Sequence, residues 1–120
     1  MRRFALMALW LCSLEISTFA ADPVDLGGVR MEHVMIPMRD GIELAANIFL
    51  PKTKGPFPTI LMRTPYDRTK AKGSAERFAK AGYITIIQDC RGTRASEGVM
   101  APYNNEGQDG YDTIEWISRQ

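Results

Sequence analysis

Residues 59–89 read TILMRTPYDRTKAKGSAERFAKAGYITIIQD, and this stretch holds the clearest indication of a fold. It opens with a short apolar run at residues 59–63 and closes with a β-branched run at residues 83–89, each typical of a buried strand. Between them, residues 71–81 carry apolar side chains at helical spacing and charged side chains on the other side, and Gly82 can end a helix. The pattern predicts a strand, a helix and a second strand parallel to the first, joined by a right-handed crossover.

A β-hairpin is predicted before this unit. Residues 29–38 show partial alternation of apolar residues, and from Ile42 to Leu50 apolar side chains stand at every second position. Asp40-Gly41 separates the two runs, and glycine adopts the positive φ that tight hairpin turns need. Two antiparallel strands therefore precede the strand-helix-strand unit.

A long loop and a further helix are predicted after the unit. Residues 91–107 are polar, contain glycines and a proline, and show little periodicity, which is typical of a functional loop. An amphipathic helix, capped by the polar residues before it, is predicted to begin near Gly107, with Tyr111 and Trp116 in the core. The predicted fold class is α/β, the opening half of a doubly wound sheet whose ligands bind at the carboxyl ends of the strands.

The beginning of the chain has the pattern of a secretory signal peptide. A basic n-region at Arg2-Arg3 precedes an apolar run at residues 4–14, and Ala20 ends a small-residue cleavage motif. The run is shorter than the roughly 20 apolar residues that span a bilayer, so no stable membrane anchor is expected. We expect residues 1–20 to be removed, the product to be exported to the periplasm or the extracellular space, and residues 21–28 to form a leader into the domain at 29–120.

The composition allows one globular domain without a strongly charged surface. The 120 residues are 45% hydrophobic and 24% charged. Loss of residues 1–20 removes two arginines and one glutamate from totals of 15 basic and 14 acidic residues, which leaves 13 of each. This balance argues against nucleic acid as a partner and favours a small or neutral molecule. Cys90 is the one cysteine after residue 20, so no disulfide forms within that segment.

Four motifs in order extend over nearly all of the segment that is expected to remain after cleavage at Ala20. They are RDGIEL at residues 39–44, RTPYD at 63–67, QDCRGTRASEG at 88–98 and DGYDTIEW at 109–116. Each motif alone is common, but their order and spacing resemble the serine hydrolases that include cocaine esterase, α-amino-acid ester hydrolases and X-prolyl dipeptidyl peptidases of the S15 type. The resemblance implies that residues 29–120 are the N-terminal part of an α/β-hydrolase domain, whose sheet is incomplete here.

The resemblance singles out Tyr66 as a catalytic residue of the oxyanion hole. In the enzymes that this sequence resembles, the tyrosine of the Pro-Tyr step donates its phenol O–H to the developing oxyanion, alongside a backbone N–H next to the nucleophile. The position suits this role, because a proline-stiffened loop at the end of a buried strand can preorganise a hydroxyl. Without the resemblance, Tyr66 would be interpreted as a packing or loop residue.

Neighbouring charged residues are predicted to support the loops. Arg63 and Asp67 flank the tyrosine, and we expect them to fix its loop through ion pairs or hydrogen bonds to backbone. Asp89 lies too early in the chain to be the acid of a triad in this fold, where the acid follows the nucleophile. We expect Asp89 to pair with Arg91 or Arg94 and to hold the loop that follows it.

His33 and Cys90 are the remaining candidates for chemistry. The catalytic histidine of this fold comes last in the triad, so His33, in an early strand, is expected to be an exposed or packed strand residue. No histidine or asparagine is positioned to activate Cys90, which favours a buried inert thiol. The sequence shows neither metal-ligand spacing nor a glycine-rich phosphate motif, so neither a metal nor a cofactor is expected.

The nucleophile of such an enzyme is absent from the sequence. A G-x-S-x-G elbow occurs nowhere in the 120 residues, and the resemblance places it shortly after Trp116. We therefore expect a truncated and inactive N-terminal portion of a serine hydrolase that cleaves acyl esters or amides through an acyl-enzyme. The alternative is a non-catalytic gene remnant or a small exported binding domain. The choice among ester, β-lactam-type amide and prolyl peptide substrates stays open, as does the oligomeric state.

Export provides a test of the N-terminal prediction. Expressed as the whole chain in a bacterial host, the protein should be recovered outside the cytoplasm with Ala21 as its first residue, because signal peptidase accepts small residues before the cleaved bond. N-terminal sequencing of the exported product measures this. Retention of Met1 in a membrane fraction would contradict the prediction.

Overall fold

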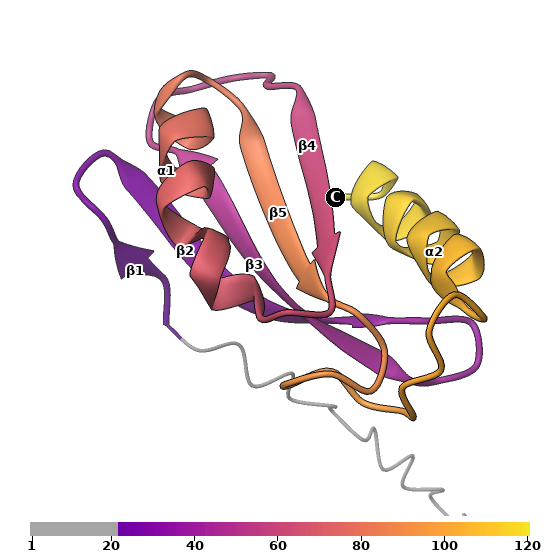
Figure 1. The fold of residues 1–120 in the computed structure, drawn as a ribbon. Helices are drawn as coiled ribbons and strands as arrows, with labels where there is room; N and C mark the ends of the chain where they lie inside the picture. The colour runs from indigo at the N-terminus through magenta and orange to yellow at the C-terminus, as the bar shows by residue number, and fades with distance from the viewer. Residues whose placement is uncertain (1–21) are drawn as a thin grey trace, which may run out of the picture.

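The computed structural model describes residues 22–120 as a mixed β-sheet flanked by helices (Figure 1). The sheet has five strands in the order β1-β2-β3-β5-β4. The elements, in chain order, are β1 (Val24–Asp25), β2 (Val29–Pro37), β3 (Glu43–Pro51), β4 (Thr59–Thr64), the 3-10 helix η1 (Arg68–Ala71), α1 (Lys72–Lys80), β5 (Ile84–Asp89) and α2 (Glu106–Ser118). An antiparallel hairpin followed by a strand-helix-strand unit and a further helix is the predicted order, so the α/β fold class is confirmed.

The predicted hairpin is formed by β2 and β3. The two strands pair antiparallel along their whole length, up to Pro37 opposite Glu43. The turn closes where Gly41 donates its N–H to the carbonyl of Met38, with 3.0 Å between nitrogen and oxygen. Gly41 has a φ of 84°, which glycine adopts without the steric cost that a side chain brings.

The strand-helix-strand unit consists of β4, α1 and β5. The two strands pair in parallel from Thr59 opposite Ile84 to Thr64 opposite Asp89. On its other side β5 pairs antiparallel with β3, which joins the parallel pair to the hairpin. Because parallel strands end at the same edge of a sheet, the segments that follow Thr64 and Asp89 lie together.

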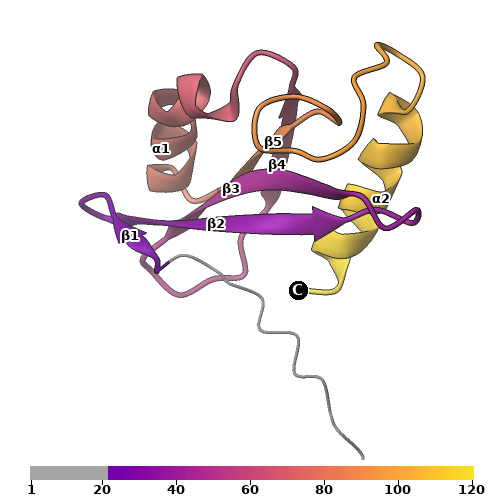
Figure 2. The ribbon, with the colours of Figure 1, turned by 90° about the horizontal axis from the view of Figure 1, so that it is seen from below.

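The two helices pack on opposite faces of the sheet, and Figure 2 shows them on either side of β4 and β5. Ile86 belongs to one buried cluster, against which Trp116 and Ile117 of α2 pack. Its neighbour Ile87 belongs to a second cluster, which includes buried alanines of α1. Alternate side chains of a strand point to opposite faces, so β5 is buried on both sides, as its continuous apolar run predicts.

Helix α2 forms where the sequence predicts it, but only part of its predicted apolar face packs against the core. No side chain caps the helix at Asn105, so the predicted capping is wrong. Tyr111 is 59% exposed, which contradicts its expected place in the core, whereas Trp116 packs against the core as predicted. The helix instead buries two polar residues, Asp109 and Thr113. Their hydrogen bonds to neighbouring elements make this burial possible.

The residues before the hairpin add a strand that the sequence did not indicate. β1 pairs antiparallel with β2 at the edge of the sheet, within the segment predicted as a leader. The predicted signal peptide, residues 1–20, lies outside the described residues. Across residues 22–120, no helix is both long enough and apolar enough to span a membrane.

Gly92, in the loop after β5, allows two backbone segments to touch. It has a φ of 68°, and a Cβ built there would lie 2.1 Å from the backbone nitrogen of Met100. Gly92→Ala should therefore lower the free energy of unfolding by about 2 kcal/mol or more, because a strained φ adds to a backbone clash. Urea unfolding followed by circular dichroism measures the change.

The matched control for this substitution is Gly73→Ala, in α1. A Cβ at Gly73 meets no atom within 4 Å, and alanine favours a helix. This variant should be as stable as the parent, or more stable by up to about 1 kcal/mol. If both variants were equally stable, the loop would have to relax around residue 92, and the requirement for glycine there would be refuted.

Candidate functional site

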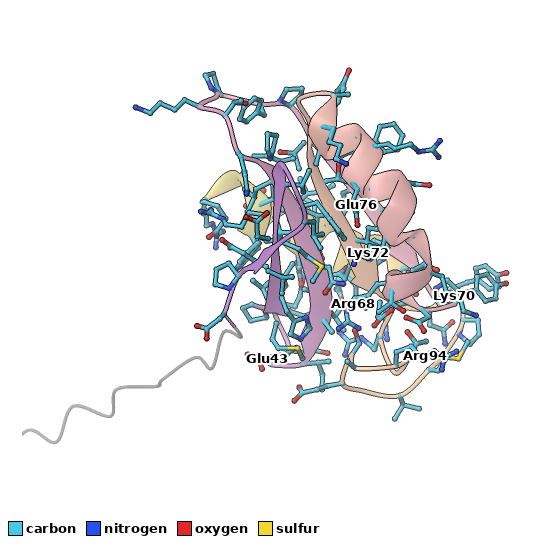
Figure 3. All side chains as sticks on the ribbon, turned by 90° about the vertical axis from the view of Figure 1, so that its left-hand side faces the viewer. Glu43, Arg68, Lys70, Lys72, Glu76 and Arg94 are labelled. Carbon is cyan, nitrogen blue, oxygen red and sulfur yellow. The ribbon has the colours of Figure 1, made fainter. Side chains whose placement is uncertain are left out.

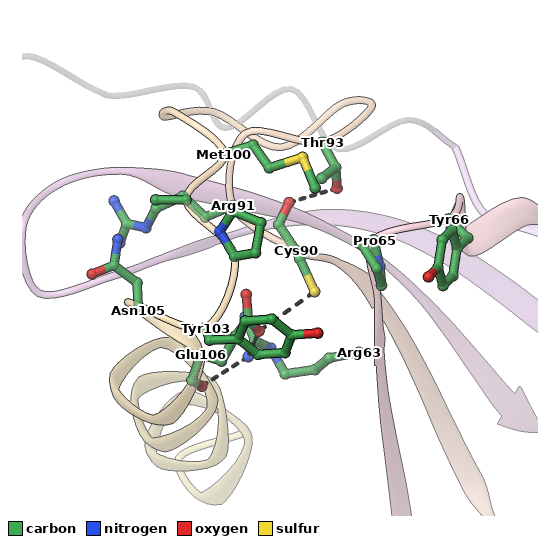
Figure 4. A pocket seen from close by; sticks show the side chains of 12 residues that line it. Arg63, Pro65, Tyr66, Cys90, Arg91, Thr93, Met100, Tyr103, Asn105 and Glu106 are labelled. Carbon is green, nitrogen blue, oxygen red and sulfur yellow. Dashed lines mark hydrogen bonds and ion pairs between the residues drawn. The ribbon is translucent and has the colours of Figure 1, made fainter.

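A cavity of about 390 Å³ opens where β4 and β5 end (Figure 4). Its walls come from three segments: the turn after β4 with Pro65 and Tyr66, the residues after β5 with Cys90 and Arg91, and the loop that leads into α2. The carboxyl ends of parallel strands are where α/β proteins bind ligands. The cavity therefore lies at the edge of the sheet for which the sequence predicts a ligand site.

Tyr66 stands on the rim of this cavity, with 77% of its surface exposed. Its backbone N–H donates to the hydroxyl oxygen of Thr64 over 3.0 Å, which closes the turn directly after β4. A phenol O–H in this position can donate a hydrogen bond to a molecule bound in the cavity.

The backbone after Tyr66 has an unusual conformation. Asp67 has a φ of 100°, which residues other than glycine rarely adopt. Its Oδ1 accepts hydrogen bonds from the backbone N–H and the hydroxyl of Thr69, at 2.9 and 2.7 Å, and so caps η1. These bonds hold the pKa of the Asp67 carboxyl below its usual value. Asp67 thus fixes the loop, in agreement with the supporting role predicted for it.

Asp89 pairs with a different arginine from the two that were predicted. The expected partners, Arg91 and Arg94, lie in the loop that follows Asp89, but the structure pairs it with Arg68, at the beginning of η1. Arg68 donates its backbone N–H to Asp89 Oδ1 over 2.7 Å and its guanidinium to Oδ2. The prediction is wrong because parallel pairing brings the turn after β4 against the end of β5, and this contact joins residues 21 positions apart.

Arg91 instead connects three of the four motifs. Its guanidinium donates to both carboxylate oxygens of Asp109 in α2, at 2.7 and 3.0 Å. It also donates to both carboxylate oxygens of Asp40 in the hairpin turn, at 2.8 and 3.2 Å. The two carboxylates raise the pKa of Arg91, and the guanidinium lowers the pKa of Asp40. The hairpin turn, the loop after β5 and α2 are therefore held together around one side chain.

Arg63 supports α2 rather than the tyrosine turn. Its guanidinium donates to the carboxylate and the backbone carbonyl of Glu106, at 2.7 and 2.9 Å, and to the side chain of Gln88 at 2.7 Å. Arg63 and Glu106 both line the cavity. The supporting role predicted for Arg63 is present, but the segment that it supports is different.

Neither Cys90 nor His33 is placed for nucleophilic catalysis. Desolvation, and after it the nearby Glu106 carboxylate, raises the pKa of the Cys90 thiol to about 11, so the thiol is protonated at neutral pH. Its Sγ lies 3.5 Å from Glu106 Oε2, in the cavity wall. His33 lies in β2 with its Nδ1 3.2 Å from Asn47 Oδ1, and it does not line the cavity. These observations agree with the predicted buried thiol and packed strand histidine.

The loop that leads into α2 supplies cavity residues that were not foreseen from the sequence. Met100 and Tyr103 both lie in the wall, and Tyr103 is 92% exposed with a φ of 69°. The only signal for them was the length of the polar loop, because a segment without periodicity gives no indication of its path. Among residues 22–120, no group of three or more His, Cys, Asp or Glu could hold a metal ion.

Comparison with known proteins connects this site to a family of hydrolases. The family model described as X-Pro dipeptidyl-peptidase (S15 family) matches residues 40–120. The cocaine esterase of Rhodococcus sp. (strain MB1 Bresler) is 41% identical to this chain over 95 residues, which cover 73% of this chain and 16% of the esterase.

Solved structures of related proteins share the fold. An aminopeptidase from a marine sediment Thaumarchaeota archaeon has a TM-score of 0.67 at 31% identity, over 78% of this chain and 19% of its own. An α-amino acid ester hydrolase has a TM-score of 0.69 at 28% identity, over 92% of this chain and 22% of its own. The chain thus spans less than a quarter of the length of these relatives. As the four motifs predict, the chain belongs to the X-Pro dipeptidyl-peptidase (S15) family of α/β hydrolases.

Proposed function

We propose that these residues form the oxyanion-binding side of the active site of a serine hydrolase, with Tyr66 as a donor. The main support is the placement of Tyr66, which is exposed on the rim of a cavity at the ends of two parallel strands. Its turn is fixed by hydrogen bonds on both sides. A donor that is held in place before the reaction stabilises developing charge without reorganisation. Membership of the S15 family supports the same assignment.

In the proposed reaction, a serine hydroxyl attacks the carbonyl carbon of an ester or amide, and its proton passes to a histidine base. The carbonyl oxygen becomes an oxyanion, to which the O–H of Tyr66 donates a hydrogen bond. Collapse of the tetrahedral intermediate expels the alcohol or amine, which takes the proton, and leaves an acyl-enzyme that water hydrolyses. Because Tyr66 acts only while the oxyanion exists, its contribution falls on kcat more than on KM.

The serine, the acid and the histidine base of this reaction are proposed to lie outside these 120 residues. The sequence contains no G-x-S-x-G elbow. The Cys90 thiol is protonated, and His33 is bound within the sheet away from the cavity. We therefore expect the chain by itself to be inactive. The proposed route needs neither a metal nor a cofactor.

A second candidate function, a non-catalytic remnant or a small exported binding domain, is favoured by the missing elbow. The downstream coding sequence separates the two candidates. An in-frame Gly-x-Ser-Tyr-x-Gly pattern shortly after Gln120 supports the hydrolase, whereas a stop codon directly after Gln120 supports the remnant.

For the hydrolase, we propose a small ester, an amide or a short peptide as substrate, in view of the related cocaine esterase and the X-Pro peptidase family. The pattern of residues 1–20 supports an exported protein.

The chain of 120 residues should not react with a serine-directed fluorophosphonate, because no serine among residues 22–120 is hydrogen-bonded to a histidine base that could activate it. Mass spectrometry of the intact protein after incubation measures the labelling. A known serine hydrolase in the same reaction shows that the reagent is active. Stoichiometric labelling of any serine in this chain would refute the expected inactivity.

Tyr66→Phe should lower kcat by about 10²–10³-fold, roughly 2.7–4 kcal/mol of transition-state stabilisation, with a smaller effect on KM. The substitution keeps the ring and removes only the hydroxyl, so folding should survive. The test uses a chimera in which residues 22–120 replace the matching N-terminal segment of the Rhodococcus cocaine esterase, which supplies the rest of the enzyme. Hydrolysis of a chromogenic acyl ester gives kcat and KM.

Tyr111→Phe is the matched control, because it removes the same hydroxyl from an exposed tyrosine that does not line the cavity. It should leave kcat within about twofold of the parent chimera. If Tyr66→Phe also kept kcat within a few-fold of the parent, the assignment of Tyr66 as oxyanion donor would be withdrawn.

A further inference from the structure

We propose that the buried pair of Asp89 and Arg68 positions Tyr66 by holding its turn against the end of β5. This inference rests on the proposed role of Tyr66. Figure 3 shows Arg68 between the sheet and α1. Neither member of the pair lines the cavity, so both act through the turn and are positioning residues.

Asp89 ends β5 with none of its surface exposed. Both carboxylate oxygens bind Arg68: Oδ1 accepts the backbone N–H at 2.7 Å, and Oδ2 accepts from the guanidinium. A carboxylate without access to water needs such partners, because an unpaired buried charge is strongly destabilising. Asp89 therefore fixes the backbone of Arg68, and not only its side chain, at one point on the sheet.

The other donors of Arg68 face the hairpin strands. Its Nε donates to Asn47 Oδ1 in β3 over 3.1 Å, and a terminal nitrogen lies 3.3 Å from Nδ1 of His33 in β2. A planar guanidinium satisfies several acceptors in fixed directions, which an ammonium group cannot reproduce. The Arg68 side chain is thus held by β5 and β3 and faces β2.

The turn that presents the tyrosine lies between two fixed points. On one side, the carbonyl of Thr64 accepts the N–H of Cys90 at 2.9 Å. On the other side, the backbone N–H of Arg68 donates to Asp89 Oδ1. Of the intervening residues 65–67, the first has its φ set by the proline ring and the last has the unusual φ of 100°. Loss of the second fixed point would let Asp67 relax and the tyrosine shift, and a misplacement of about 1 Å can lower a rate about 10²-fold.

Stability alone does not account well for such a pair. A buried ion pair is often no more stabilising than packed apolar residues of similar volume, because both charges lose their water. Apolar contacts already join α1 to the sheet through Ala75 and Ala79. What the pair adds is a defined direction, since hydrogen bonds set where the turn lies relative to β5 and apolar contacts do not.

Cleavage by chymotrypsin after Tyr66 measures this anchoring without requiring activity. In the whole chain, Arg68→Gln should raise the cleavage rate after Tyr66 about tenfold or more, because proteases cut segments that open locally. Cleavage after Tyr103, exposed in a separate loop, is the internal reference. Arg68→Lys keeps a positive charge beside Asp89, so the fold should be retained. Because an ammonium group cannot reproduce the contacts of the guanidinium, this variant should be cleaved after Tyr66 at a rate between those of the parent and Arg68→Gln.

Asp112→Asn is the matched control for cleavage. The Asp112 carboxylate, like that of Asp89, accepts hydrogen bonds from the backbone N–H and the guanidinium of one arginine, here Arg39 in the hairpin turn. Neither Asp112 nor Arg39 lines the cavity. Its substitution should leave cleavage after Tyr66 unchanged. Unchanged cleavage in both Arg68 variants would overturn the proposed anchoring.

Kinetics of the chimera test whether the anchoring of the turn by Arg68 affects the rate of catalysis. Arg68→Gln should lower kcat about 10- to 100-fold with KM within about threefold, and Arg68→Lys should recover part of the loss. In a Tyr66→Phe background, Arg68→Gln should lower kcat less than about threefold, because the hydroxyl that it positions is gone. Equal effects in the two backgrounds would overturn the positioning role.

The inference and the proposed function fail in different ways. If the single variant Tyr66→Phe had an unchanged kcat, the oxyanion role of Tyr66 would be refuted. The proposal that Arg68 positions a catalytic donor would then be refuted as well. The cleavage rates then still show whether Arg68 holds the turn. If Tyr66→Phe lowered kcat as expected while Arg68→Gln left both kcat and the cleavage rate unchanged, only the positioning role of Arg68 would be refuted.

Discussion

The parallel pairing of β4 with β5 is the contact on which the site depends. It sets Thr64 opposite Asp89 and so brings the turn after one strand beside the loop after the other. The cavity and the exposed tyrosine on its rim follow from this juxtaposition. Both faces of the pair are covered, with Ile86 in one buried cluster and Ile87 in the other. A register shift of one residue would exchange these faces, so the packing that stabilises the sheet also places the site.

Three arginines connect loops that apolar packing leaves without fixed positions. Arg68 ties the turn before η1 to β5, Arg91 ties the hairpin turn to α2, and Arg63 ties the beginning of α2 to β4. A guanidinium suits this task because it binds several acceptors in a fixed plane. Arg63 and Arg91 both pair with Asp109, so residues from separate motifs form one polar framework beside the cavity, and Arg68 with Asp89 is a separate pair.

These contacts favour a site that contributes fixed positions for hydrogen-bond donors rather than a reactive side chain. The thiol in the cavity wall is made less reactive by its surroundings, since burial and a neighbouring carboxylate raise the pKa of Cys90. An oxyanion donor needs a defined position, and a backbone pinned on both sides of a short turn supplies one. In the division that we propose, the described residues orient a donor and the reacting groups come from elsewhere, and membership of the S15 family supports this proposal.

Short-range patterns in the sequence were enough to predict the hairpin, the strand-helix-strand unit and α2, because alternation, helical spacing and turn glycines act over a few residues. The motifs likewise indicated the family and drew attention to Tyr66. The partner of each charge depended on the folded chain: Asp89 binds Arg68 instead of a nearer arginine, and α2 buries Asp109 while Tyr111 faces solvent. The spacing of charged side chains does not show which of them will pair, because any carboxylate can pair with any guanidinium. Strand pairing and helix docking therefore choose among them, and these join residues that are distant in sequence.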